Sequence, residues 1–332
     1  QIINRSVAIA SLSMTQMQTP KVALGDQSAA LAAMDAKFLS LQSAIASLGS
    51  AAAAYNSAVS DGSVAGASAG TGAFQGVYSL EVVDIGSYTS VMSADAGLLK
   101  VTDPSTTSIS TSADFTLTVG GVAQPLITPA ANTLTDLANA INASGAGVEA
   151  TIVNLGTSAT PDYRLSLAST KLGAVSVELT DGTTDLLGTP SAGTLASYRV
   201  NGQPTAAIES DSRSVTLAPG LTATLLKAGT AQITVSHNTS GVGGTLSSIA
   251  KAYNAAVDEI DKYHAEGGSK ALRGSSMLYV LSQSLRDIAG YSSGSGAISS
   301  LASLGLGFDD KGKLSVDQVV FSAATDGQFQ AL

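Results

Sequence analysis

The chain has no cysteine and no tryptophan, and only 5% of its 332 residues are aromatic. The absence of cysteine excludes disulfides, thiolate metal sites and cysteine nucleophiles. Charged residues make up 12% of the chain, which is about half the usual share, and the net charge is −9 without any cluster of Lys or Arg. Because nucleic-acid binding needs basic patches, we expect no nucleic-acid partner. No apolar run approaches the roughly 18 residues of a membrane-spanning helix, so we expect no membrane partner either.

Residues for catalysis are also scarce. The two histidines, His237 and His264, are far apart in sequence and do not form the H-x-x-x-H spacing of a zinc site. The G-x-S-x-G pattern of serine hydrolases occurs around Ser68 and Ser292, but neither serine lies between a predicted strand and a predicted helix, as a nucleophile requires. The acidic segment 309–313 lacks the alternating ligands and closing Glu of a calcium loop. We therefore predict no enzyme activity, no cofactor and no bound metal.

What the sequence does contain is apolar residues that alternate in steps of three and four, as on one seam of a packed helix. The first stripe is Leu31, Met34, Phe38, Leu41, Ile45, Leu48, Ala52 and Tyr55. The second is Leu246, Ile249, Tyr253, Ala256, Ile260 and Tyr263, and a short third one is Leu278, Leu281, Leu285 and Ile288. We interpret Tyr253 and Tyr263 as core residues and the adjacent Asp258, Glu259 and Asp261 as a solvent-exposed face. Such helices are unstable alone, so we expect them to pack on one another.

Two Gly- and Ser-rich segments, 57–72 and 240–244, separate the stripes from the middle of the chain. They carry no periodicity, so we interpret them as domain boundaries. Before the first stripe, residues 1–24 have a weaker helical pattern that Pro20 interrupts. The segment 25–28, Gly-Asp-Gln-Ser, then offers capping residues for a new helix.

Between the boundaries the apolar period changes to two, which is typical of strands. We predict strands over 77–82, 115–119, 148–153, 163–167, 175–179, 198–200, 215–217, 221–225 and 233–235. Asn201-Gly202 predicts a tight hairpin turn. Thr133, followed three residues later by Asp136, predicts the cap of a helix whose apolar face is Leu134, Leu137 and Ile141. After the third stripe, a second hairpin is predicted over 306–316, followed by the start of another helix.

These patterns predict a multidomain α+β protein, in which a discontinuous helical bundle, or leg, carries inserted β-rich head domains. The expected division is 1–64 as the outgoing leg, 65–98 as the first part of an inner β domain, 99–195 as an outer α/β domain, 196–240 as the second part of the inner domain, and 241–332 as the returning leg with a hairpin. Because the chain starts at Gln1 without a Met or a secretory signal, we also expect that it is a fragment.

Several segments, in this order along the chain, resemble the flagellar filament cap family, FliD or flagellar hook-associated protein 2. One of them, Gly76-Val77-Tyr78-Ser79-Leu80-Glu81-Val82, resembles the strand that opens the head in that family. Four further segments of the chain resemble a module that several flagellar axial proteins share: Leu117–Gly121, Thr133–Asn142, Gly147–Val153 and Tyr163–Ser169. The family's return leg is similar to Ala252-Tyr253-Asn254 and to the segment from Ser300 to Asp317.

The resemblance implies a ring-like homo-oligomer at the distal end of the filament, which promotes the folding and insertion of flagellin and prevents its loss. The implied partners are flagellin and other flagellar axial proteins. The implied location is extracellular, at the flagellum tip, after export by the flagellar type III route. Function would then depend on assembly surfaces, with no catalytic residue.

Other functions stay open at this point. Another flagellar axial protein, such as a hook–filament junction protein or a flagellin-like protein, shares the same class. An extracellular adhesin or glycan-binding module would use the β-rich head, although that region has few aromatic residues for sugar stacking: Tyr88, Phe115, Tyr163 and Tyr198. A serine hydrolase at Ser68 or Ser292 is the third alternative.

Overall fold

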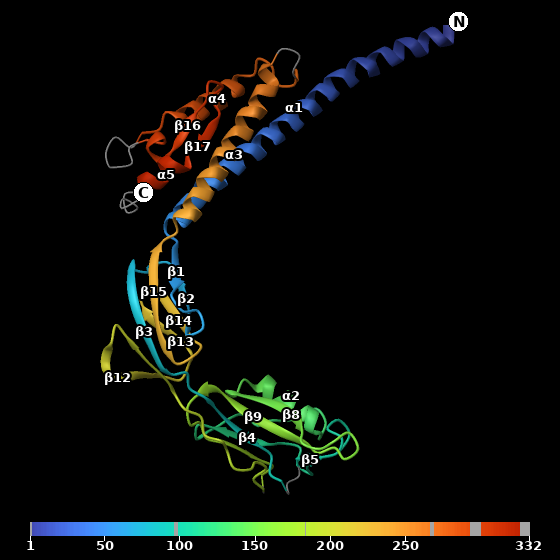
Figure 1. The fold of residues 1–332 in the computed structure, drawn as a ribbon. Helices are drawn as coiled ribbons and strands as arrows, with labels where there is room; N and C mark the ends of the chain where they lie inside the picture. Colours follow the sequence, from blue (N-terminus) through green and yellow to red (C-terminus); the bar gives the residue numbers. More distant parts are fainter. Residues whose placement is uncertain (1, 96–98, 183, 266–268, 293–299, 326–332) are drawn as a thin grey trace. The chain divides into compact units, whose positions relative to one another are not determined.

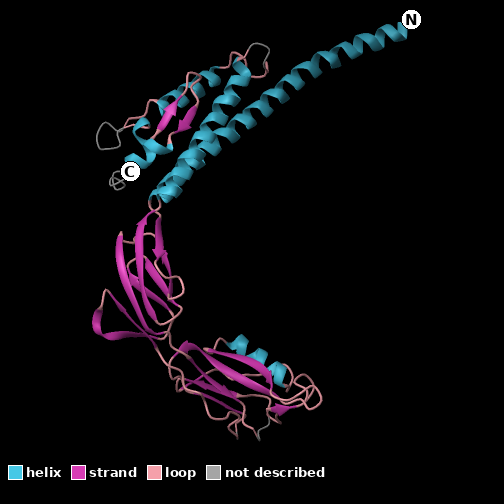
Figure 2. Cartoon of the chain, viewed as in Figure 1, coloured by secondary structure: helices cyan, strands magenta, loops and turns pink. Residues whose placement is uncertain are grey.

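The structure is a computed structural model that describes residues 2–95, 99–182, 184–265, 269–292 and 300–325. It divides into two compact units, of which one combines residues 1–56 with 237–332 and the other comprises residues 57–236. Helices dominate the first unit and strands the second (Figure 2). This arrangement confirms the predicted α+β class with a β-rich insertion. The finer division into five segments stays a prediction.

The helical unit is assembled from both ends of the chain. In its described part it contains α1 (Ile2–Ala52), α3 (Thr239–His264), α4 (Ser276–Ala289), the 3-10 turn η1 (Ala302–Leu304), β16 (Leu306–Phe308), β17 (Leu314–Val316) and α5 (Gln318–Thr325). The helices α1 and α3 lie side by side, and the N-terminal part of α1 continues beyond the end of α3 (Figure 1). The predicted third helix and the predicted hairpin over 306–316 are confirmed by α4 and by the β16–β17 pair.

The helix α1 is continuous, although the sequence predicted a break at Pro20 and a new helix start over 25–28. Pro20 lies inside the helix and the predicted capping residues lie within it as well. A proline lacks the N–H for one helical hydrogen bond and costs about 3 kcal/mol in a helix interior, but it leaves the bonds of the other turns intact. The Ala, Leu, Met and Lys residues on both sides favour the helix and carry it through this position.

The helix α3 begins earlier than predicted, because it includes the segment 240–244 that the sequence indicated as a boundary. Asn238 caps the helix: its side-chain Oδ1 accepts a hydrogen bond from the N–H of Gly241 at 2.8 Å. Gly243 lies against Phe321 of α5, whose ring would be 3.2 Å from a Cβ at this position. The glycine therefore allows close packing of α5 on α3, and this packing stabilises a helical start that the composition alone disfavours.

In the second unit, two sheets form what we call the inner sheets. Their strands are β1 (Tyr55–Val59), β2 (Ala65–Ala69), β3 (Gly76–Asp84), β11 (Ala196–Val200), β12 (Gln203–Ser210), β13 (Ser214–Ala218), β14 (Leu221–Leu225) and β15 (Gly229–His237). One sheet has the order β1-β15-β3-β11-β12 and the other the order β13-β14-β2. The strands β1 and β2 correct the predicted linker over 57–72, and Tyr55 belongs to β1 rather than to the helical stripe. The β2 strand consists of Ala, Gly and Ser, and β1 (Tyr-Asn-Ser-Ala-Val) does not alternate apolar and polar residues; pairing with β15 and β14 orders the two strands instead.

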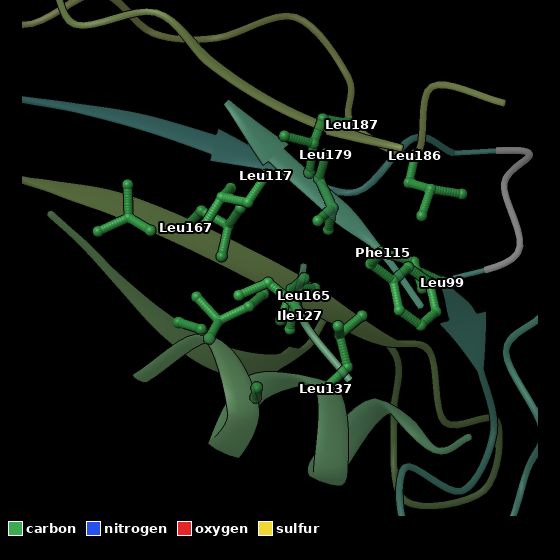
Figure 3. Close-up of a cluster of buried hydrophobic side chains, with 14 of the residues drawn as sticks. Leu99, Phe115, Leu117, Ile127, Leu137, Leu165, Leu167, Leu179, Leu186 and Leu187 are labelled. Atoms are coloured by element: carbon green, nitrogen blue, oxygen red, sulfur yellow. The ribbon is translucent and has the colours of Figure 1, made fainter. Parts of the chain in front are cut away.

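The outer domain, as we call residues 88–180, is a sheet pair covered by one helix. Its elements are β4 (Tyr88–Met92), β5 (Lys100–Val101), β6 (Thr116–Val119), β7 (Val122–Ala123), α2 (Leu134–Ser144), β8 (Val148–Asn154), β9 (Tyr163–Leu172) and β10 (Val177–Thr180). The predicted cap is confirmed, because the Thr133 hydroxyl accepts a hydrogen bond from the N–H of Asp136 at 3.2 Å. Figure 3 shows Leu137 of α2 pointing toward Leu165 and Phe115, which are fully buried.

Candidate assembly surfaces

The seam between α1 and α3 is the largest helix–helix contact of the helical unit. The second predicted stripe is buried in full: Leu246, Ile249, Tyr253, Ala256, Ile260 and Tyr263. From α1, Ala30, Met34 and Leu41 are buried against it, and Ala44, Leu48 and Ala51 are partly buried. A large apolar side chain contributes about 1.5–3 kcal/mol when it is fully buried, so this seam holds the two ends of the chain together.

The first predicted stripe is divided between this seam and the surface of α1. Met34 and Leu41 are buried, Phe38 and Leu48 are partly buried, and Leu31 and Ile45 are exposed. The buried face of α1 runs through Ala30, Ala44 and Ala51, one position before the predicted residues. Alanine allows a close approach of α3, and this rotates α1 relative to the predicted orientation. Leu31 and Ile45 are therefore more exposed than a buried seam residue would be, although Ile45 still lies near Leu246 of α3.

The displaced residues belong to a second apolar line, which we call the outer seam of α1. Its members occur every seven residues, and four of them are exposed: Met17 (70%), Leu24 (67%), Leu31 (38%) and Ile45 (43%). Phe38, the remaining position of this heptad series, is partly buried. A seven-residue repeat keeps side chains on one face of a helix, and exposed apolar rows of this kind are typical of interaction surfaces.

An apolar groove of about 280 Å³ lies at one end of the outer seam. The residues that line the groove include Ile45 and Leu48 of α1, Leu246 of α3 and Ile288 of α4. The exposed aromatic residue Tyr291 stands beside it. The described residues that line the groove present hydrocarbon to it, so it suits an apolar side chain better than a polar substrate.

The β16–β17 hairpin is fixed to α3 by the side chain of Asn254. Its Nδ2 donates to the carbonyl oxygen of Leu314 at 2.8 Å, and its Oδ1 accepts from the N–H of Leu314 at 2.7 Å. Nearby, Lys313 Nζ lies 2.6 Å from Asp258 Oδ1, and the ring of Phe308 packs edge-on against Tyr253 at 5.6 Å. The resemblance included Asn254 without a role, and the structure supplies one. Its side-chain amide makes the pair of backbone hydrogen bonds that a neighbouring strand would otherwise make.

The carboxylate of Glu259 corrects another expectation, since it is only 4% exposed instead of facing solvent. Its Oε2 lies 2.6 Å from Lys262 Nζ, and its Oε1 accepts a hydrogen bond from the Tyr263 hydroxyl at 3.4 Å. Burial, together with the negative charge of Glu259, raises the pKa of the Tyr263 hydroxyl. Asp258 and Asp261 do remain at the surface. Glu259 is therefore a satisfied buried group whose partners lie one helical turn further along.

Comparison with known protein families identifies this arrangement. The family model of the flagellar hook-associated protein 2 N-terminus matches residues 1–88, and that of the flagellar hook-associated protein 2 C-terminus matches residues 193–332. The chain belongs to the flagellar hook-associated protein 2 (FliD) family. A third model, the flagellin hook IN motif, matches residues 114–171, which include β6, α2 and β8 of the outer domain. No curated protein matches the sequence.

One solved structure shows the same fold over most of the chain. The D1-D2-D3 domains of the flagellar cap protein FliD from Escherichia coli match with a TM-score of 0.69 at 24% identity, covering 91% of this chain and 88% of that one. The D2-D3 domains of the same protein match at 24% identity and a TM-score of 0.42, covering 56% and 99%. FliD (HAP2) from Pseudomonas aeruginosa matches at 22% identity and a TM-score of 0.41, covering 61% and 97%.

The candidate catalytic residues of this FliD-family chain do not come together. Ser68 lies within β2, and Ser292 forms an isolated bridge with Ser300, while positions 293 and 294 of its motif lie outside the described residues. His237 ends β15 and stacks on Tyr55 with ring centroids 4.5 Å apart, and His264 ends α3. Within the described ranges, no group of three or more potential metal ligands occurs. No described helix is long and apolar enough to cross a membrane.

Segment 309–313 is a turn, as expected. The Asp309 carboxylate accepts hydrogen bonds from the N–H groups of Lys311 and Lys313 at 2.9 and 2.8 Å, and Gly312 has a φ of 72°. These bonds to the Asp309 carboxylate close the end of the hairpin. The Tyr253 hydroxyl also finds a backbone partner, the carbonyl oxygen of Leu285, at 3.4 Å.

Proposed function

We propose that this chain caps the distal end of the bacterial flagellar filament, where it promotes flagellin folding and insertion and prevents the loss of flagellin. The observation that carries the proposal is the pair of family matches at residues 1–88 and 193–332, which enclose the rest of the β-rich unit. The Escherichia coli protein with the same fold is a flagellar cap protein. The flagellin hook IN motif in the outer domain adds a second link to the flagellar axis.

The proposal includes a ring-like assembly of several copies, with flagellin and other flagellar axial proteins as further partners. The outer seam of α1 supports this part, because Leu24, Leu31 and Ile45 expose apolar side chains that an isolated chain leaves in water. The seam leads to a groove that the described residues line with apolar groups, and both features suit packing between proteins. We place the assembly outside the cell at the flagellum tip, after export by the flagellar type III route.

This function needs surfaces and no chemistry. The proposal therefore assigns no catalytic residue and no cofactor to the chain. Of the alternatives, a hook–filament junction protein or a flagellin-like protein would use the same helical unit at a different place on the flagellum. An adhesin would use the β-rich unit without any effect on the filament.

A deletion strain tests the proposal in the bacterium that carries the gene. We expect the strain to lack normal filaments and to release unpolymerised flagellin into the medium, and a plasmid copy of the gene to restore both. Normal filaments without released flagellin would contradict the cap function, and a defect in surface adhesion alone would support the adhesin alternative.

A pair of variants separates assembly from folding in the same strain. Leu24→Asp together with Leu31→Asp places charges on the outer seam, and we expect this variant to restore filaments poorly. Ser43→Asp, at an exposed position on another face of α1, serves as the matched control and should restore them fully. Equal rescue by both variants would show that the outer seam has no part in assembly.

A further inference from the structure

The chain passes twice between the inner sheets and the outer domain, and the two passages are paired with each other. The first lies between β3 and β4, and the second leads into β11. The N–H of Ser87 donates to the carbonyl oxygen of Thr194 at 2.9 Å, and the N–H of Thr194 donates to that of Ser87 at 3.1 Å. Their hydroxyl groups lie 3.2 Å apart. Two connections side by side would still permit bending, as in many two-domain hinges.

Glycines in such passages usually indicate flexibility, but here they allow the backbones to touch. A Cβ at Gly86 would lie 2.6 Å from the nitrogen of Ala196. A Cβ at Gly193 would lie 2.6 Å from the carbonyl oxygen of Gly173 and from the nitrogen of Thr89. Both distances are shorter than any van der Waals contact, so a side chain at either position would force the passages apart. The glycines are a requirement of close packing.

A threonine hydroxyl fills the centre of this contact. Thr89 is 2% exposed, and its Oγ1 accepts hydrogen bonds from the N–H groups of Val175 and Gly193, both at 3.0 Å. The same hydroxyl donates to the carbonyl oxygen of Gly173 at 2.8 Å. Its donor and acceptor capacity is therefore used, and it ties three backbone segments together directly.

A third segment, which belongs to neither passage, joins the inner sheets to the outer domain. We call it the brace; it consists of residues 211–213, between β12 and β13. Arg213 donates from Nε to the carbonyl oxygen of Ile85 at 3.1 Å and from Nη2 to that of Gly86 at 3.0 Å, and its guanidinium lies 5.4 Å from the ring centroid of Tyr88.

Asp211 supplies the other half of the brace. Its carbonyl oxygen accepts the N–H of Leu172 at 2.8 Å, and its carboxylate lies 2.8 Å from Lys171 Nζ at the end of β9. The ion pair is exposed and therefore weak. The two hydrogen bonds from Arg213 are partly buried and so less exposed to water than this ion pair. The planar guanidinium can donate to two carbonyl groups at once, which the ammonium of a lysine does not do in the same geometry.

We propose that the brace locks the crossing into a rigid joint, so that the inner sheets and the outer domain move as one body, with Arg213 as the residue that holds it. Three separate attachments fix the orientation of two bodies, whereas two adjacent ones leave an axis of rotation. The inference does not depend on the cap function, since it concerns the β-rich unit by itself.

Distance measurement by electron paramagnetic resonance tests this joint, and the absence of native cysteine makes labelling clean. Spin labels are attached at Glu149→Cys in β8 and Thr230→Cys in β15, both exposed positions. We expect one narrow distance distribution in the otherwise unchanged chain. Arg213→Ala should lose that single narrow peak and give a broad distribution. A broad distribution in the unchanged labelled chain would overturn the proposal.

Two further variants keep the test decisive. Arg199→Ala is the matched control, because Arg199 donates to Thr205 and pairs with Glu81 within the inner sheets; it should keep the narrow peak. Arg213→Lys keeps the charge and loses the fork, and we expect intermediate broadening with an unchanged circular dichroism spectrum. A narrow peak in well-folded Arg213→Ala or Arg213→Lys would assign the rigidity to the paired passages and overturn the role of Arg213.

Discussion

Replacing Asn254 with alanine removes both hydrogen bonds through which α3 holds the backbone of Leu314. The two bonds are 2.8 and 2.7 Å long, and Leu314 is buried, so water has little access to the groups left behind. Leaving a buried donor or acceptor unpaired costs about 1–3 kcal/mol. Alanine is the better helix former and returns about 0.5 kcal/mol. Because one donor and one acceptor are both left unpaired, we expect a net loss of about 1.5–5.5 kcal/mol in the unfolding free energy of the helical unit.

Hydrogen exchange and denaturation measure this loss at two levels. The variant should unfold at a lower guanidinium concentration, followed by circular dichroism at 222 nm, and the peptide covering 306–316 should exchange faster than in the unchanged chain. Ser248→Ala, an exposed substitution on the same helix, controls for helix propensity. If Asn254→Ala changed stability by less than about 0.5 kcal/mol and left the exchange of 306–316 unaltered, the reasoning about buried backbone groups would be refuted.

Three further predictions concern other contacts. Met34→Ala should lower the stability of the helical unit by about 2–5 kcal/mol, as a large-to-small change at a buried position does, whereas Leu31→Ala should cost much less. Equal losses of stability in denaturation would contradict this and place both residues on one seam. Asn142→Ala in α2 should destabilise the β-rich unit, because the Asn142 amide makes the same pair of bonds to the β8 backbone, at 2.9 and 2.7 Å; unchanged thermal melting would contradict this. Hydrogen bonds from Arg164 hold the pKa of the Asp162 carboxyl below its usual range. The stabilisation from these bonds is therefore present above about pH 4 and is lost as the pH falls through the lowered pKa. Thermal melting of Asp162→Asn between pH 3 and 6 should show a flatter acid dependence than melting of the unchanged chain.

The second helical stripe could be read from the sequence because large apolar residues dominate it. Leu246, Ile249 and Ile260 leave one possible buried face, and the structure buries all three. On α1 the large residues Leu31 and Ile45 suggested a face that the structure exposes. Periodicity finds the apolar side of a helix, but small alanines decide which part of that side a neighbouring helix approaches.

Strands without an alternating apolar pattern cannot be predicted from periodicity in this way. The alternation of apolar residues such as Leu80 predicted β3, whereas β2 consists of Ala, Gly and Ser, β1 has no such alternation, and both depend on their partner strands. Contacts between residues distant in the chain are equally hidden. The bond of Asn254 to Leu314 and the grip of Arg213 on the passage at Ile85 follow from the fold, and no local pattern indicates them.

Immunogold electron microscopy with an antibody against the outer domain would show where on the flagellum this chain lies. For a cap at the filament tip, we expect label at the distal end of each filament and nowhere else along it. Label along the whole filament would indicate a flagellin-like subunit, and label at the base would indicate a hook–filament junction protein. Either result would contradict the proposed function.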